Sequence, residues 1–240
     1  MSFRVALVTG SGQGIGRQIA LRLGKEASVA GVAIHYRRNF AQAQAVAGEI
    51  REMNKLAECF KADLEKKSEA VDLIKKVERK FGRLDILVNN VGPFMTKRWD
   101  RLDFSDWEKS LRGNLFGSYF CLKAALPGMR KRKWGRIINI GYSRAEQQAS
   151  FPTILPYAVA KSGLLLLTRT AAVPEIANGI TVNMVSPGLI KGGAMPDVKD
   201  LDDSRMGTFS DVAEAVNFLV SGRAAAITGT NIIVAGTWKM

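Results

Sequence analysis

The stretch Val5-Ala-Leu-Val-Thr9-Gly10-Ser-Gly-Gln-Gly-Ile-Gly16 decides the fold expected of this 240-residue chain. A short apolar, β-branched run precedes the glycines and an amphipathic segment at residues 17–25 follows them, which predicts a strand, a loop and a helix in that order. Gly10, Gly14 and Gly16 permit a tight turn and a close approach of the backbone to a pyrophosphate, and the start of a helix favours negative charge. The stretch therefore predicts a dinucleotide-binding loop.

The next predicted strand, Val32-Ala-Ile-His-Tyr36, ends about 20 residues beyond that loop, where an NAD-binding unit carries Asp or Glu for the ribose 2′-hydroxyl. Tyr36, Arg37 and Arg38 occupy this position instead. Because the carboxylate is missing and a guanidinium can bind a 2′-phosphate through two hydrogen bonds, the turn predicts a preference for NADP. An exposed basic turn without a ligand is the alternative. His35, the single histidine, is expected to pack rather than to catalyse.

Strand-like and helical segments alternate along the rest of the chain. Strands are expected at residues 58–61, 84–88, 136–140, 180–185 and 231–235, and helices at about 40–54, 65–80, 102–133 in two pieces broken near Gly113, 157–178 and 210–220. This alternation predicts an α/β fold, a doubly wound parallel sheet of seven strands with the Rossmann arrangement, in a single domain over residues 1–240. Pro174 should kink its helix or end it early, and residues 191–208 are expected to form a substrate flap.

Residues that follow two of these strands are expected to meet the glycine loop. In a doubly wound sheet with right-handed crossovers, the carboxyl ends of the strands lie along one edge. Asp63 follows the third strand and Asn90-Val91-Gly92 follow the fourth. They should therefore line the same crevice as the loop.

Tyr157 and Lys161 are four residues apart, so both side chains should lie on one face of a helix, about one turn from each other. Such a pair is common by chance in solvated helices. Here a neighbouring ammonium is expected to lower the pKa of Tyr157 from its reference near ~10, which makes the phenol a usable acid near neutral pH. Asn114 falls in an apolar helix, where its amide needs partners, so it is either a structural bridge or a residue that holds a water.

Composition narrows the classes of function. Hydrophobic residues make up 47% of the chain, but no apolar run approaches the ~20 residues that cross a bilayer, and the chain starts directly with a strand, so a cytoplasmic protein without membrane contact is expected. Cys59 and Cys121 lack the spacing of a disulfide framework or a metal site, and no metal is expected. The net charge of +13 makes an anionic cofactor, nucleic acid or an acidic protein a candidate partner.

The basic run Arg130-Lys-Arg-Lys-Trp-Gly-Arg136 supports an alternative, a non-enzymatic module that binds nucleic acid or an acidic protein. Such a module would have no need of Asn114, Tyr157 and Lys161 together, and we therefore favour an enzyme and do not expect nucleic acid as its partner. The same basic surface would also steer an acidic macromolecular substrate.

In their order along the chain, these motifs resemble those of the short-chain dehydrogenases/reductases, and among them the 3-oxoacyl-[acyl-carrier-protein] reductases. The resemblance extends from Arg4 to about Trp238 and rests on Thr9-Gly10-x-x-x-Gly14-x-Gly16, Asn89-Asn90-x-Gly92, Asn114, a serine after the fifth strand, Tyr157-x-x-x-Lys161 and Pro187-Gly188. Membership would imply hydride transfer between a nicotinamide and a carbonyl or alcohol carbon.

The resemblance also implies a role for each site residue. Tyr157 would donate a proton to the substrate oxygen, and Lys161 would hold the nicotinamide ribose. Ser143 would donate a hydrogen bond to the substrate oxygen, and Asn114 would fix a water that re-protonates the lysine and ribose. The expected NADPH contacts are Gly10, Ser11, Gln13, Gly14, Ile15, Gly16, Tyr36, Arg37, Arg38, Asp63, Leu64, Asn90, Val91, Gly92, Tyr157, Lys161, Pro187, Gly188 and Ile190, with adenine near Asp63 and Leu64 and the nicotinamide amide near Ile190.

The expected partners follow from the same resemblance. The substrate would be a small carbonyl compound, either free or carried on an acidic acyl-carrier protein. The protein would form a homo-oligomer, a tetramer or a dimer, through the helices that start near Asn114 and Tyr157. In support, the apolar run Leu164-Leu-Leu-Leu167 is more surface than one small domain covers on that face.

The sequence departs from the family pattern at several places. Val91 stands where alanine is usual, which leaves the backbone contact possible. Tyr142 occupies the place of the usual serine and the loop that follows is slightly longer, so either Ser143 or Tyr142 would contact the substrate oxygen. The segment after Pro187-Gly188 is shorter than the usual lid, and Pro174 interrupts a helix that relatives use for dimer packing. A catalytically impaired relative is therefore a further alternative.

Overall fold

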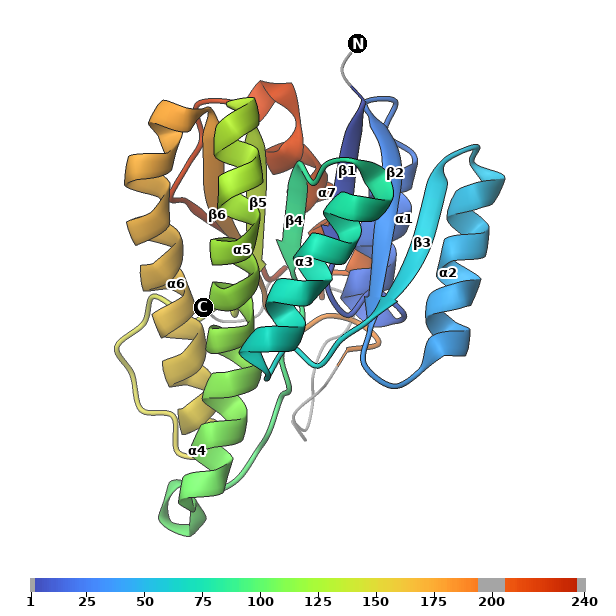
Figure 1. Cartoon of the computed structure of the whole chain (residues 1–240). Coiled ribbons are helices and arrows are strands. Elements are labelled where there is room, and N and C mark those ends of the chain that lie inside the picture. The colour runs from blue at the N-terminus through green and yellow to red at the C-terminus, as the bar shows by residue number, and fades with distance from the viewer. Residues whose placement is uncertain (1–2, 194–205, 237–240) are drawn as a thin grey trace.

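The computed structural model describes residues 3–193 and 206–236 of the chain (Figure 1). Its sheet consists of β1 (Arg4–Val8), β2 (Val29–Tyr36), β3 (Leu56–Lys61), β4 (Ile86–Asn89), β5 (Gly135–Ile140), β6 (Ile180–Pro187) and β7 (Asn231–Val234). The strands lie in the order β3-β2-β1-β4-β5-β6-β7, and every neighbouring pair is parallel. The predicted doubly wound parallel sheet of seven strands is confirmed, and its strand order reverses between β1 and β4.

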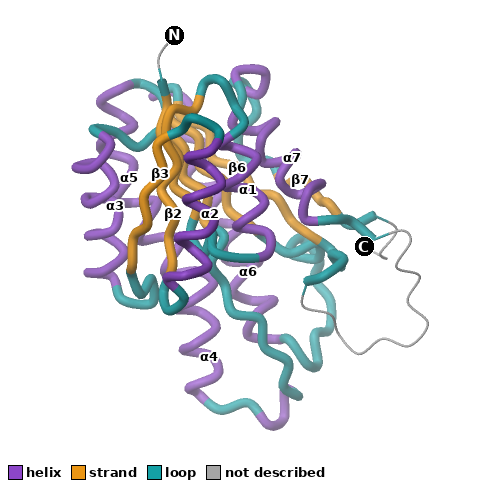
Figure 2. Tube along the Cα trace, turned by 90° about the vertical axis from the view of Figure 1, so that its right-hand side faces the viewer, coloured by secondary structure: helices purple, strands orange, loops and turns teal. Residues whose placement is uncertain are grey.

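Helices cover both faces of the sheet, which Figure 2 shows from its edge. One face carries α1 (Gly14–Gly24), α2 (Phe40–Glu52) and α7 (Phe209–Val220), and the other carries α3 (Lys67–Phe81), α5 (Gly117–Arg132) and α6 (Leu155–Glu175). Side chains of one strand alternate between the two cores: Ala6 and Val8 pack toward α1 and α7, and Leu7 packs toward α3 and α5. Because both faces are buried, the central strands are almost entirely apolar.

The carboxyl ends of the strands form the lower edge of the molecule in Figure 1, and α4 (Phe104–Leu111) projects beyond it. The two helical pieces predicted on either side of Gly113 are present as α4 and α5, and the break between them is a change of helix type. A π-helical turn (Arg112–Phe116) joins α4 to α5, so the chain remains helical there. Glycine is needed for close packing, since a Cβ at Gly113 would lie 2.5 Å from Cδ of Pro93. The wide turn buries Asn114 completely.

α6 ends at Glu175, directly after Pro174, and continues as a 3₁₀ turn (Ile176–Asn178). The expected early end of this helix at Pro174 is confirmed. The run at residues 164–167 is not the exposed surface that its sequence suggested. Leu164 and Leu165 are buried and only Leu166 is strongly exposed, at 65%, because α6 turns one side of the run toward the core.

Most of the basic side chains at residues 130–136 contact other residues of the fold. Arg130 forms an ion pair with the buried carboxylate of Glu175. The guanidinium groups of Arg4 and Arg136 lie 4.0 and 4.5 Å from the centre of the Trp134 ring. The tryptophan thus stacks on two arginines of its own chain, which removes the interleaved pattern that pointed to nucleic acid.

Only the two ends of the predicted flap at 191–208 belong to the described residues, and residues 194–205 lie outside them. The amide of Lys191 donates to the carbonyl of Gly207 at 3.0 Å, so these ends lie side by side. Over residues 3–193 and 206–236, no helix has the length and apolar character needed to span a membrane.

Candidate active site

The glycine loop between β1 and α1 is tied to β2 through His35. The amide of Gly10 donates to Nδ1 of His35 at 2.9 Å, and Nε2 lies 3.1 Å from the carbonyl oxygen of Ala62. Because Nδ1 accepts, the proton is on Nε2 and the ring is neutral. Burial lowers the pKa of His35 to about 4. His35 packs inside the strand, as predicted, and also joins the glycine loop to the end of β3.

Ser11 faces the strands rather than the crevice. Its Oγ donates to the carbonyl of Val8 at 2.8 Å and accepts the amide of His35 at 3.1 Å, while its own amide donates to the carbonyl of His35 at 3.1 Å. Neither its hydroxyl nor its amide is available for the predicted phosphate contact. Ser11 therefore shapes the loop instead of binding through these groups.

The remainder of the loop fits the pyrophosphate of a dinucleotide. Gly10 and Gly14 have φ of +64° and +55°, which glycine adopts without strain, and a Cβ at Gly14 would meet no atom within 4 Å. Gln13, at the N-cap of α1, makes no capping bond with its side chain, and the first turn holds no acidic residue. The first amides of α1, through Ile15 and Gly16, are thus left for an anion.

The two arginines after β2 differ in their partners. Arg37 is engaged with carboxylates, since Nη1 lies 2.5 Å from Glu65 Oε1 and Nε lies 3.6 Å from Asp63 Oδ1. Arg38 is exposed, and within the described part of the chain it has no hydrogen-bond or ion-pair partner. Tyr36 packs its ring on the first residue of α2. Of the two guanidinium groups, that of Arg38 is the one that is free to meet a 2′-phosphate.

The end of β4 is bonded to the glycine loop, which confirms that these two segments lie side by side at the strand ends. Oγ1 of Thr9 accepts the amides of Asn90 at 2.8 Å and of Val91 at 3.1 Å, and Nδ2 of Asn90 donates to the carbonyl of Thr9 at 2.9 Å. A Cβ at Gly10 would come within 3.0 Å of Val91 Cγ2. Asp63 lies at the end of β3 on the same edge, but the predicted adenine contact Leu64 has its side chain in the core.

Two polar groups meet behind Gly92. Nζ of Lys161 is buried and donates to the carbonyl of Ile140 at 2.7 Å, and burial lowers the pKa of Lys161 to about 8. Nδ2 of Asn114 donates to backbone carbonyls, that of Pro93 at 2.9 Å among them, whereas its Oδ1 is buried without a partner. A Cβ at Gly92 would lie 2.3 Å from this Oδ1 and 3.2 Å from Nζ of Lys161. Both atoms therefore lie close to each other against Gly92, where they leave no room for a side chain.

Tyr157 lies one turn before Lys161 on α6, and Nζ of the lysine is 5.7 Å from the centre of the tyrosine ring. The pKa of Tyr157 is nevertheless raised, mainly by burial and further by the charge of Tyr142. The expectation of a lowered pKa is therefore wrong, because burial of the phenol, which disfavours its charged form, is the largest effect on it. The rings of Phe94 and Tyr142 contact Tyr157 edge-on, with centres 5.1 and 5.5 Å away.

Ser143 and Tyr142, the two candidates for the second hydrogen bond to substrate, differ in exposure. Ser143 is buried, its amide donates to the carbonyl of Pro187 at 3.0 Å, and its Oγ has no partner. Tyr142 is half-buried; burial raises its pKa, and the charge of the Arg144 guanidinium opposes that rise. Its ring lies against that of Tyr157. Tyr142 is thus the more accessible of the two candidates, whereas the hydroxyl of Ser143 is sealed from solvent.

Pro187 ends β6, and Gly188 and Ile190 follow it along the same edge. The amide of Gly188 donates to the carbonyl of Val234 at 2.9 Å, and a Cβ at Gly188 would lie 2.7 Å from that of Ala235. Ile190 is buried and bridges to Gly207. The backbone after Pro187 is thus fixed against β7, beside the loop that carries Ser143.

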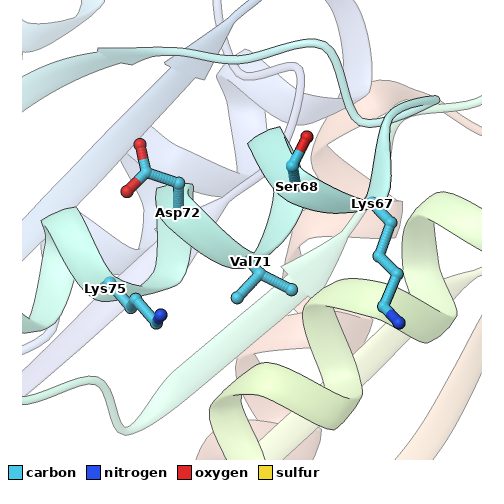
Figure 3. A pocket seen from close by; sticks show the side chains of 5 residues that line it. All are labelled: Lys67, Ser68, Val71, Asp72 and Lys75. Carbon is cyan, nitrogen blue, oxygen red and sulfur yellow. The ribbon is translucent and has the colours of Figure 1, made fainter.

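Sequence reasoning missed three groups at the site: His35 as a tie of the glycine loop, Phe94 against Tyr157, and Arg144 beside Tyr142. Phe94 closely follows the Asn90-Val91-Gly92 motif, but no spacing predicts its contact with α6. A shallow depression on α3, shown in Figure 3, is lined by Lys67, Ser68, Val71, Asp72 and Lys75 and includes none of these site residues.

Comparison with known proteins identifies the family. A family model described as short chain dehydrogenase matches residues 4–202. The chain belongs to the short-chain dehydrogenase family. This short-chain dehydrogenase is 35% identical to a 3-oxoacyl-[acyl-carrier-protein] reductase of Staphylococcus epidermidis, with 98% of each chain covered. It is also 35% identical to a 3-oxoacyl-[acyl-carrier-protein] reductase of Synechocystis, over 100% of this chain and 98% of that one.

Solved structures agree with this assignment. A putative short-chain alcohol dehydrogenase from Sinorhizobium meliloti superposes with a TM-score of 0.90 at 30% identity, covering 98% of this chain and 96% of the other. An acetoin dehydrogenase from Salmonella typhimurium gives a TM-score of 0.87 at 29% identity, covering 100% and 99%. The short-chain dehydrogenase described here is thus an oxidoreductase of a family that uses NAD or NADP.

Proposed function

We propose that this short-chain dehydrogenase is an NADPH-dependent reductase of carbonyl compounds, with 3-oxoacyl compounds among its candidate substrates. The observation that carries the proposal is the close approach of Asn114 Oδ1 and Lys161 Nζ at Gly92, one helical turn from Tyr157 and next to the residues that bond to the glycine loop. A proton donor, a buried cation and a water-holding amide are what carbonyl reduction requires beside a dinucleotide site. The relatives named as 3-oxoacyl-[acyl-carrier-protein] reductases support the substrate class.

The nicotinamide supplies a hydride to the carbonyl carbon when it is bound. Tyr157 donates its phenolic proton to the carbonyl oxygen, which becomes an alcohol. Its raised pKa keeps the phenol protonated at neutral pH, so that the proton is present when the oxygen becomes basic. Lys161 balances the phenolate that remains, and the water held by Asn114 returns a proton. Tyr142, whose ring lies against that of Tyr157, positions the substrate oxygen in the place where the family has serine.

The proposed preference for NADPH rests on the turn after β2. Arg38 supplies a free guanidinium for the 2′-phosphate, and no carboxylate occupies the end of β2 to accept a 2′-hydroxyl. Arg37, bonded to Glu65 and Asp63, orders this turn. The arrangement supplies the charge that distinguishes the phosphorylated cofactor.

We further propose a homo-oligomer, a dimer or tetramer, in the cytoplasm. Apolar side chains remain exposed along α5 and α6, namely Tyr119 at 39%, Val159 at 43%, Leu166 at 65% and Val173 at 77%. Such a row on adjacent helices is typical of a self-complementary interface. Sedimentation at micromolar protein should show an assembled species, and a monomer alone would contradict this part of the proposal.

The test of the reaction is NADPH oxidation against a panel of carbonyl compounds: an acetoacetyl thioester, the same acyl group on an acyl-carrier protein, diketones and quinones. We expect turnover of at least one of these with NADPH, and slower turnover with NADH. Binding to duplex and single-stranded nucleic acid is measured beside it. Nucleic-acid binding without any turnover would replace the reductase proposal by a binding function.

A further inference from the structure

The loop between β5 and α6 carries Arg144 to the edge of the site. Its guanidinium lies 4.9 Å from the centre of the Phe151 ring, and its Nε donates to Oε1 of Gln147 at 2.6 Å. The loop itself is fixed, since the amide of Ala145 donates to the carbonyl of Tyr142 at 2.9 Å and Oγ of Ser162 donates to the carbonyl of Ala145 at 2.9 Å. Arg144 is therefore held in place by neutral groups.

Arg144 belongs to the same cluster as the proton donor. Its guanidinium lies on the ring of Phe151, whose centre is 6.3 Å from that of Tyr142. The ring of Tyr142 in turn lies edge-on against that of Tyr157, with centres 5.5 Å apart. A cation thus borders the cluster of rings around the group that protonates the substrate.

No carboxylate among the described residues forms an ion pair with Arg144. This sets it apart from Arg37 and Arg130, which both have carboxylate partners. The nearest acid in sequence, Glu146, is bonded to Arg169 at 2.8 Å and to Nδ2 of Asn231 at 3.3 Å. A half-buried guanidinium at the edge of this cluster, without a carboxylate partner, suits the two oxygens of a carboxylate.

We propose that Arg144 binds a carboxylate of the carbonyl substrate, so that the preferred substrates are short oxo acids with the carboxylate a few bonds from the carbonyl. The inference rests on the proposed carbonyl reduction. The reaction balances as before: hydride goes to the carbonyl carbon, the proton of Tyr157 goes to its oxygen, and the carboxylate is unchanged. By binding the carboxylate, Arg144 fixes which end of the substrate faces away from Tyr157.

The experiment compares acetoacetate, which is charged, with methyl acetoacetate and an acetoacetyl thioester, which are neutral at the same carbonyl. Arg144→Gln removes the charge and keeps a hydrogen-bond donor. We expect it to lower kcat/KM for acetoacetate roughly ten- to hundredfold and to leave the neutral compounds within about threefold, because only the anion loses a charged partner. Arg144→Lys should restore part of the loss for acetoacetate. Arg169→Gln, an arginine paired with Glu146 outside this cluster, is the matched control and should alter neither.

A second measurement does not depend on turnover of the anion. 3-Hydroxybutyrate, which resembles the product, should inhibit reduction of methyl acetoacetate competitively in the wild type. Its inhibition constant should be at least tenfold higher in Arg144→Gln. The ratio of kcat/KM for acetoacetate to kcat/KM for methyl acetoacetate should fall in Arg144→Gln, and an unchanged ratio would overturn the oxo-acid inference. The inference would also be overturned if the wild type reduced the neutral compounds but not acetoacetate. Carbonyl reduction itself would stand in both cases. If the wild type reduced none of these three compounds and none of the wider panel, both the oxo-acid inference and the proposed carbonyl reduction would be overturned.

Discussion

The two halves of the site differ in how fully their polar groups are satisfied. The cofactor half consists of the glycine loop and β2. In it, Gly10 and Ser11 form hydrogen bonds with His35 and with the end of β1. In the catalytic half, around β4, the π-helical turn and β5, buried polar atoms lack partners, namely Asn89 Oδ1, Ser110 Oγ, Asn114 Oδ1 and Ser143 Oγ. No residue of the glycine loop or of β2 shares this property within the described chain.

This difference separates two ways of preparing a site. A phosphate is bound by backbone amides, so the loop that presents them is held rigid by its own hydrogen bonds. A proton transfer needs partners that arrive and leave, so the catalytic half keeps acceptors and donors open for water and substrate. Each of the following changes removes a group from one half and is expected to leave the other half intact.

The largest effect is expected for Tyr157→Phe. The ring still packs between Phe94 and Tyr142, but the proton donor is lost, so carbonyl reduction should fall ~10²–10⁴-fold while NADPH binding persists. Stopped-flow reduction and a fluorescence titration with NADPH measure the two properties separately. A variant within about fivefold of the wild type would mean that Tyr157 is not the acid.

The pair Tyr142→Phe and Ser143→Ala distinguishes the two candidates for the second hydrogen bond. Tyr142→Phe should lower kcat by roughly 10²-fold, as loss of one oxyanion donor does, because Tyr142 lies against the proton donor Tyr157. Ser143→Ala removes a buried hydroxyl without a partner and should change kcat less than about threefold, with stability unchanged or improved. The reverse order of effects would assign the role to Ser143.

Acid should lower the free energy of unfolding through His35, which ties the glycine loop to β3. The folded pKa of about 4 lies below the unfolded value near 6.5, so the unfolded chain gains a proton first and stability is lost as pH falls through that window. Between pH 7 and pH 5 the loss should be about 2 kcal/mol. Urea unfolding at both pH values measures it, and His35→Asn, which keeps an acceptor for Gly10 but does not titrate in this range, should abolish most of the difference. An equal loss in His35→Asn would show that other groups are responsible.

The smallest effect is expected at the turn after β2. NADPH should bind more tightly than NADH, and Arg38→Ala should weaken NADPH about tenfold while NADH changes little, because one charge-assisted phosphate contact is removed. Arg37→Ala should have a smaller effect, since Arg37 is occupied by Glu65 and Asp63. Fluorescence titrations of both cofactors against the wild type and the two variants give the six dissociation constants. Equal affinities in the wild type would contradict the NADPH preference, and a larger effect at Arg37 would show that it leaves its carboxylates to bind phosphate.

The sequence by itself determined the fold and the composition of the catalytic pair. The strand, glycine loop and helix at residues 5–25 are local patterns, set by period and by glycine conformation, and the alternation that follows them specifies a parallel sheet. Strand ends in such a sheet meet along one edge, which is why the contact of Asn90 and Val91 with the loop was predictable. The spacing of Tyr157 and Lys161 is a property of one helix and needed no tertiary information.

Only the tertiary structure decided where each polar group points and how it is charged. Burial raises the pKa of Tyr157 although a lysine is one turn away, because desolvation depends on everything packed around the hydroxyl. The inward turn of Ser11, the division between Arg37 and Arg38 and the unmatched charge of Arg144 all depend on side chains from distant segments. A local pattern fixes backbone conformation and helix faces, whereas hydrogen-bond partners and electrostatics are set by contacts across the fold, which no spacing along the chain records.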